Sequence, residues 1–188
     1  MHTRRAFLKA GAGGTTLTLA FSVGGGLLLL TPAEARARRV PWSRLTASEA
    51  ELLQQLAEAI VPGAAEAGVG PFVDQQIGVD PDDCMLIAKY FQVPPPYLSF
   101  YRSGLAAVNA LAGQKFGKGV DQLDTAALDE LIGQLSRPGT RVGAIDVSMF
   151  YLCLRSDAVD VVYGTPKGFE RLAVPYMAHI MPPEGWNG

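Results

Sequence analysis

The clearest structural signal in the chain is the stretch LTASEAELLQQLAEAI, which occupies residues 45–60. It opens with a capping box, in which Thr46 can cap a helix and Glu49 can return a hydrogen bond to the cap. Its leucines and its final isoleucine recur at helical spacing on one face, and Val61-Pro62-Gly63 ends the pattern. The stretch therefore predicts an amphipathic helix that buries one face.

Apolar residues continue at helical spacing after this helix and predict further helices. Their expected ranges are 71–77, 80–91, 97–116, 124–135 and 146–162, with a last segment over 169–180 that Pro175 breaks. Alternation with a period of two is scarce, and we identify no hairpin dipeptide between apolar runs. These patterns predict an all-α fold. Because 188 residues fit one domain, we expect a single compact multi-helix domain after a cleavable signal segment.

The composition is that of a globular protein and excludes several function classes. The chain is 48% hydrophobic and 18% charged, which is too apolar for a disordered chain and too mixed for a polytopic membrane protein. It has 16 basic and 18 acidic residues and a net charge of -2. Because a duplex-binding protein usually needs a basic excess, we expect no nucleic-acid partner.

The N-terminus is typical of a twin-arginine export signal. Every position from residue 3 to residue 9 fits the motif, whose defining residues are Arg4, Arg5, Phe7, Leu8 and Lys9. An uncharged run follows, and small residues at alternating positions then offer a cleavage site after Ala35 or Ala37.

The uncharged run, residues 10–33, is also long enough to serve as a permanent membrane anchor. Its six glycines lower hydrophobicity and helix propensity and so favour a cleaved signal. We expect residues 1–35 to be a twin-arginine signal peptide, residues 36–44 to be an extended arm, and residues 45–188 to be the helical domain.

Twin-arginine export carries folded proteins, which hold a cofactor or travel with a partner that holds one. This chain has no Walker loop and no glycine-rich dinucleotide loop after a strand, and it has only two cysteines and two histidines. We therefore expect no catalytic site, cofactor or metal in this chain, and a partner that carries the cofactor.

The two thiols and a few carboxylates are the remaining candidates for chemistry. Cys84 and Cys153 leave three arrangements open: an internal disulfide, two buried free thiols, or a bond to another chain. An autonomous enzyme would have to draw its acid and base groups from Asp74, Asp146 or His179. The acidic run at residues 80–83 lacks the rest of a calcium loop.

Aromatic residues gather in the glycine- and proline-rich C-terminal third of the chain. Such side chains on poorly helical segments are typical interface anchors, although ordinary core packing is the alternative. The candidate partner interface consists of Tyr163, Gly164, Phe169, Tyr176 and Trp186.

Several of these features, taken in order, resemble the gluconate 2-dehydrogenase subunit 3 family. They are the twin-arginine leader, the helix pattern of residues 45–63, Gly68-Val69-x-x-Phe72-Val73-Asp74, and Val162-Tyr163-Gly164. The resemblance covers most of residues 3–186. The sequence departs from the family after Tyr163-Gly164, where Thr165-Pro166-Lys167-Gly168 replaces the usual Gly-Asn.

The resemblance implies a division of labour between subunits. A large flavoprotein of the glucose-methanol-choline type would bind FAD and oxidise a sugar, sugar acid or alcohol, and a multihaem cytochrome c would accept the electrons. The small subunit would be non-catalytic: it would carry the export signal to the twin-arginine translocon and bind the flavoprotein. The complex would be periplasmic and peripheral to the inner membrane. Two alternatives stay open, a solitary exported binding or structural protein and an autonomous periplasmic enzyme.

Overall fold

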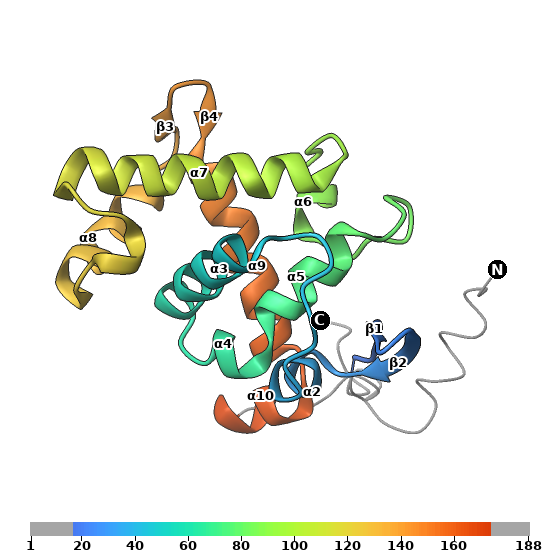
Figure 1. The fold of residues 1–188 in the computed structure, drawn as a ribbon. Coiled ribbons are helices and arrows are strands. Elements are labelled where there is room, and N and C mark those ends of the chain that lie inside the picture. The colour runs from blue at the N-terminus through green and yellow to red at the C-terminus, as the bar shows by residue number, and fades with distance from the viewer. Residues whose placement is uncertain (1–16, 174–188) are drawn as a thin grey trace, which may run out of the picture.

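In the computed structural model, residues 17–173 are described. They form a mostly helical domain, which confirms the predicted fold class. Helix α9 (Val147–Tyr163) runs through the middle of the domain and packs against most of the other helices (Figure 1). Its buried face is almost entirely apolar, so the core is built around this helix.

Helix α3 (Ala47–Ile60) forms where the capping box predicts it. The Thr46 hydroxyl accepts a hydrogen bond from the Glu49 amide at 3.2 Å, and the Glu49 carboxylate accepts one from the Thr46 amide at 2.8 Å. The buried face of α3 contacts α5 (Val69–Ile77), α7 (Tyr97–Phe116) and α9. Local capping and helical periodicity therefore agree with the tertiary packing.

The longest helix, α7, lies across α9 at a glycine (Figure 1). A Cβ atom at Gly104 would lie 2.2 Å from the ring of Phe150, so only glycine allows this approach. Beyond α7, the chain forms the short 3-10 helix η2 (Val120–Gln122) and then α8 (Thr125–Leu135). Asp124 caps α8, because its carboxylate accepts a hydrogen bond from the Ala127 amide at 2.9 Å, and the helix forms over the range that the sequence predicts.

The helix predicted over residues 80–91 is wrong, because only the short α6 (Ile87–Tyr90) forms there. The Met85 amide instead donates to the side-chain oxygen of Gln76 at 2.7 Å. The Ile87 amide donates to the Asp157 carboxylate at 2.9 Å. Because distant side chains satisfy these amides, the helical hydrogen bonds do not form.

Two hairpins form between residues 17 and 173, although no hairpin dipeptide was identified between apolar runs in the sequence. β1 (Leu19–Val23) pairs with β2 (Gly26–Leu30) in an antiparallel register. Gly24 and Gly25 make the turn with φ of 58° and 83°, values that glycine adopts without strain. A second, shorter hairpin joins β3 (Arg141–Val142) to β4 (Ile145–Asp146).

Helix α2 (Pro32–Ala37) lies where the sequence predicts the end of the signal peptide. Thr31 and Glu34 form a second capping box at its start. The arm predicted over residues 36–44 therefore begins with the last two residues of this helix. The prediction did not take the second capping box into account. Between residues 17 and 173, no helix has the length and apolar character needed to cross a bilayer.

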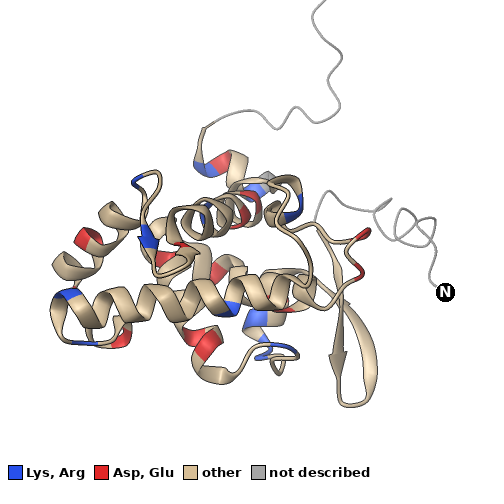
Figure 2. Ribbon diagram, turned by 90° about the horizontal axis from the view of Figure 1, so that it is seen from above, with Lys and Arg blue, Asp and Glu red and all other residues tan. Residues whose placement is uncertain are grey.

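Charged residues are distributed over the helices, whereas the β1–β2 hairpin carries none (Figure 2). The leucines at positions 27 and 29 on β2 are 68% and 62% exposed. The hairpin therefore presents apolar side chains to solvent as well as to the domain.

Candidate functional site

The C-terminal end of α9 and the following helix α10 (Pro166–Arg171) form a tight corner. Tyr163 is the last residue of α9, and its side chain is half-buried. The Thr165 hydroxyl caps α10 by accepting a hydrogen bond from the Gly168 amide at 3.0 Å. Phe169, also half-buried, lies on α10.

Three of the five predicted interface residues, Tyr163, Gly164 and Phe169, therefore lie on this corner. The other two, Tyr176 and Trp186, lie outside the described residues, as does His179. That these residues contact a partner stays a prediction.

Gly168 allows the backbone of α10 to approach the end of α9 this closely, and Gly164 fits against the last turn of α9. A Cβ atom at Gly168 would lie 2.4 Å from the carbonyl oxygen of Val162, and one at Gly164 would lie 2.4 Å from that of Asp160. A side chain at position 168 would force α10 away from α9, whereas one at position 164 would clash with the Asp160 carbonyl in the last turn of α9. This contact with Asp160 is the physical reason for the glycine in the Tyr163-Gly164 pair.

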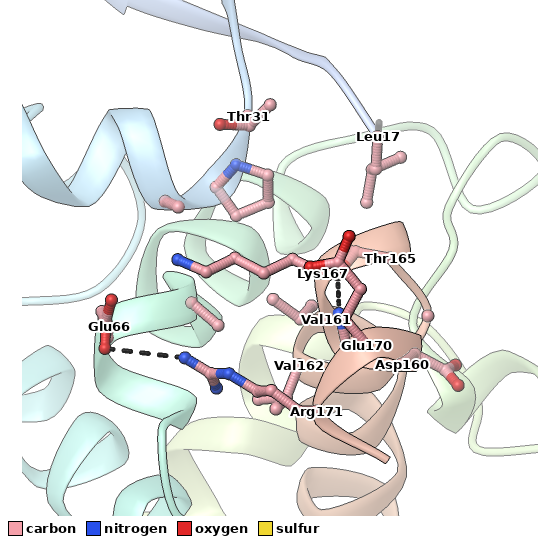
Figure 3. Close-up of a pocket in the computed structure, with 15 residues that line it drawn as sticks. Leu17, Thr31, Glu66, Asp160, Val161, Val162, Thr165, Lys167, Glu170 and Arg171 are labelled. Atoms are coloured by element: carbon pink, nitrogen blue, oxygen red, sulfur yellow. Dashed lines mark hydrogen bonds and ion pairs between the residues drawn. The ribbon is translucent and has the colours of Figure 1, made fainter. Parts of the chain in front are cut away.

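A cavity of about 830 Å³ opens beside the corner (Figure 3). One wall comes from α9 and α10, a second from α4 (Ala64–Ala67), and a third from the start of α2 with the residue before it. Its lining includes Thr31, Pro32, Ala33, Glu66, Asp160, Val162, Lys167 and Arg171. The cavity thus joins the predicted interface corner to the predicted end of the leader.

The cavity is lined by both apolar and charged side chains. Arg171 reaches across it to Glu66, with nitrogen and oxygen 3.8 Å apart, and Lys167 extends in the same direction (Figure 3). Because both partners are largely exposed, this ion pair contributes little to stability. Burial raises the pKa of the Asp160 carboxyl above its ordinary value. Apolar surface rimmed by both signs of charge is typical of a protein-binding surface.

The region from residue 47 to residue 180 matches the gluconate 2-dehydrogenase subunit 3 family. The chain belongs to this family. No curated protein and no solved structure gives a significant match. Membership of the gluconate 2-dehydrogenase subunit 3 family is consistent with an accessory subunit and implies a partner dehydrogenase complex.

The cavity crosses the boundary of the gluconate 2-dehydrogenase subunit 3 match. Its walls on α4, α9 and α10 lie inside the matched residues, whereas Thr31, Pro32 and Ala33 precede them. The family domain therefore supplies most of the cavity, and residues 31–33 supply another wall.

The carboxylate of Asp74 in this gluconate 2-dehydrogenase subunit 3 domain binds the backbone before α3. One oxygen accepts from the Ser43 amide at 2.7 Å and its hydroxyl at 2.9 Å. The other accepts from the Arg44 amide at 2.9 Å and the Leu45 amide at 2.7 Å. Asp74 thus joins the segment before α3 to α5, which explains the aspartate in the Phe72-Val73-Asp74 pattern.

Asp146, a second candidate acid or base, caps α9. Its carboxylate accepts hydrogen bonds from the Met149 amide at 3.0 Å and the Ser148 hydroxyl at 2.7 Å. The Ser148 hydroxyl is the main group that lowers the pKa of Asp146. Like the carboxylate of Asp74, that of Asp146 accepts hydrogen bonds from groups within the domain, here at the first turn of α9.

Sequence reasoning missed one buried carboxylate, that of Asp157 on α9, which is 1% exposed. It accepts hydrogen bonds from the Tyr101 hydroxyl and from the Ile87 amide. Burial raises the pKa of Asp157 to about 7, despite these hydrogen bonds, which lower it. Its signal was present, because position 157 falls on the apolar stripe that Leu154 and Val161 define.

Cys84 and Cys153 are free and buried in the structure, which is the second of the three arrangements considered. Burial raises the pKa of Cys84, and it raises the pKa of Cys153 to about 12 with a further contribution from Asp157. The Cys84 thiol donates a hydrogen bond to the Gln76 carbonyl at 3.5 Å. Both thiols are therefore poor nucleophiles in the folded chain.

The predicted export motif, Arg4 to Lys9, lies entirely outside the described residues, whereas the predicted cleavage sites lie inside them. Ala35 and Ala37 are both in α2, and Ala35 is 0% exposed. In the residues that the structure covers, no cluster of histidine, cysteine or acidic side chains could hold a metal ion.

Proposed function

We propose that this protein is a non-catalytic accessory subunit of a periplasmic FAD-dependent dehydrogenase complex. It binds a large flavoprotein of the glucose-methanol-choline type, escorts it through twin-arginine export and stabilises it afterwards. The observation that carries the proposal is that a gluconate 2-dehydrogenase subunit 3 domain, residues 47–180, follows a twin-arginine motif in the same chain. An export signal for folded cargo is thereby attached to a subunit of a dehydrogenase complex.

The hydrogen bonds that the candidate carboxylates make support a binding role. Asp74 and Asp146, which an autonomous enzyme would draw on, are occupied by backbone amides and neighbouring hydroxyls. The mixed-charge cavity beside Tyr163 and Gly164 offers a surface for another protein. Substrate oxidation then belongs to the flavoprotein, and a multihaem cytochrome c passes its electrons onwards.

A large interface would stabilise the flavoprotein by mass action. Loss of the small subunit should therefore lower the amount of periplasmic flavoprotein before it changes the turnover of each remaining molecule. The test is to delete the gene and to measure flavoprotein abundance and bound FAD in the periplasm. A matched strain carries Arg4→Lys and Arg5→Lys, which alter the export motif and leave the domain intact.

We expect both strains to lose periplasmic flavoprotein, and the double variant to accumulate it in the cytoplasm. Normal export of the flavoprotein in the deletion strain would overturn the escort role. Dehydrogenase activity of the purified small subunit alone would favour the autonomous enzyme, and a monomer in native extracts would favour the solitary protein.

A further inference from the structure

The end of the predicted leader is packed into the domain. Leu19, Phe21 and Leu30 of the β1–β2 hairpin are buried, and Ala35 of α2 has no exposed surface. The side chain of Gln75 on α5 donates a hydrogen bond to the Ala20 carbonyl at 3.3 Å. The hairpin and α2 contact each other and α5, so residues 17–37 behave as one docked segment.

Two backbones approach each other closely in this docking. A Cβ atom at Gly68 would lie 2.1 Å from the carbonyl oxygen of Pro32. Gly68 also has a φ of 86°, which disfavours any other residue. The domain therefore accepts a backbone at this point, and Pro32 supplies it.

The docked segment covers the same part of the domain that the corner residues border. α2 packs against α4 and α5, and Thr31, Pro32 and Ala33 form one wall of the cavity whose opposite wall carries Lys167 and Arg171 (Figure 3). A protein that docked on Tyr163, Gly164 and α10 would meet residues 31–33 at the edge of its footprint. The two occupants cannot both cover this cavity.

We propose that residues 17–37 occupy the docking surface of the large flavoprotein subunit in the unassembled precursor, so that flavoprotein binding displaces them. The proposal rests on the proposed function, because it needs that subunit as the partner. Residues 17–37 pack on α4 and α5 of this surface and face its remaining parts, the end of α9 and α10, across the cavity. Displacement releases the leader and uncovers the cleavage sites after Ala35 and Ala37, which folded α2 protects. Export and cleavage thereby depend on assembly.

The coupling between flavoprotein binding and the docking of residues 17–37 is reciprocal. If the flavoprotein displaces the segment, then a variant that loosens the segment must bind the flavoprotein more tightly. Phe21→Asp places a charge on the buried face of β1, and Ser22→Asp places the same charge on its exposed face. Ala35→Leu and Ala37→Leu form a second pair, since one alanine of α2 is buried and the other is exposed.

The experiment uses the full-length precursor and the purified FAD-containing large subunit. We expect Phe21→Asp and Ala35→Leu to lower the dissociation constant by roughly tenfold or more, as expected when a mostly closed surface opens. Ser22→Asp and Ala37→Leu should match the parent chain. Hydrogen exchange adds a test on the unaltered protein: amides of residues 31–37 should exchange slowly in the free precursor and faster in the complex.

Each outcome has a separate meaning. Equal affinities in all four variants, or slower exchange of α2 in the complex, would overturn the displacement and leave the accessory function standing. No binding by any version of the chain would overturn the proposed function itself. Loss of helical signal in Phe21→Asp would remove that variant only, because the exchange measurement does not depend on it.

Discussion

The Tyr101 hydroxyl on α7 donates a hydrogen bond to the Asp157 carboxylate on α9, in the interior where these two helices cross. Both side chains are almost completely buried. Burial, the charge of Asp157 and this hydrogen bond hold the pKa of Tyr101 well above its ordinary value. The centre of the domain therefore contains a carboxyl group whose ionisation is unfavourable. The free energy of unfolding should then depend on the protonation of this group.

We predict that Asp157 makes the domain less stable as the pH rises from about 4 to about 7. The pKa of Asp157 is about 7 in the folded chain against an ordinary value of 3.8. In this window the unfolded chain loses the proton and the folded chain keeps it, so rising pH favours unfolding. The loss amounts to about 1.4 kcal/mol per pH unit, on the order of 4 kcal/mol in total.

Asp157→Asn, a neutral side chain of the same shape, should remove this slope. The measurement is the free energy of unfolding by urea at several pH values for both proteins, because their difference cancels the other titrating groups. A difference that stays constant between pH 4 and pH 7 would show that the Asp157 pKa is not raised.

The thiols offer a second prediction, since both cysteines are buried and free. With a pKa of about 12 for Cys153, only about one molecule in ten thousand carries that thiolate at pH 8. The native protein should therefore react with an aromatic disulfide reagent far more slowly than the urea-unfolded protein. Unfolded protein prepared without reductant should release two equivalents. Zero equivalents before reduction and two after it would instead establish a disulfide, which is internal if the unreduced protein migrates as a monomer on a denaturing gel.

Asp74 gives a third prediction, because its carboxylate accepts four hydrogen bonds from the segment before α3. Asp74→Ala leaves buried donors unsatisfied and should lower the free energy of unfolding by about 2–4 kcal/mol. Asp83→Ala, at an exposed turn position, is the matched control and should change it by less than about 0.5 kcal/mol. Equal effects of the two substitutions, measured by urea unfolding, would contradict the structural role of Asp74.

The sequence predicts best where the cause is local. The capping box at Thr46 and the capping residues Asp124 and Asp146 lie beside the helices that they start, and each helix begins where expected. The segment over residues 80–91 fails for the opposite reason. Its amides bind Gln76 and Asp157, and no local pattern shows that these side chains come close.

The candidate site follows the same division. The Tyr163-Gly164 pair and Phe169 could be singled out from composition, because glycines and aromatics stand out in that region. The cavity could not be predicted, since one wall comes from Thr31 and Pro32 at the other end of the chain. The hairpin was missed because Gly24-Gly25 lies within an uncharged run that reads as a leader.

Two glycines of α7 give a last prediction in which the same substitution has opposite effects. At Gly113 an added Cβ meets nothing within 4 Å, so Gly113→Ala should stabilise the domain by about 0.5–1 kcal/mol through helix propensity. At Gly104 the added Cβ would lie 2.2 Å from the Phe150 ring, so Gly104→Ala must push α7 away from α9. Overpacking of this kind costs about 1–3 kcal/mol and outweighs the gain in propensity. Thermal unfolding of the two variants should therefore move in opposite directions, and a stabilised Gly104→Ala protein would contradict the close crossing of the two helices.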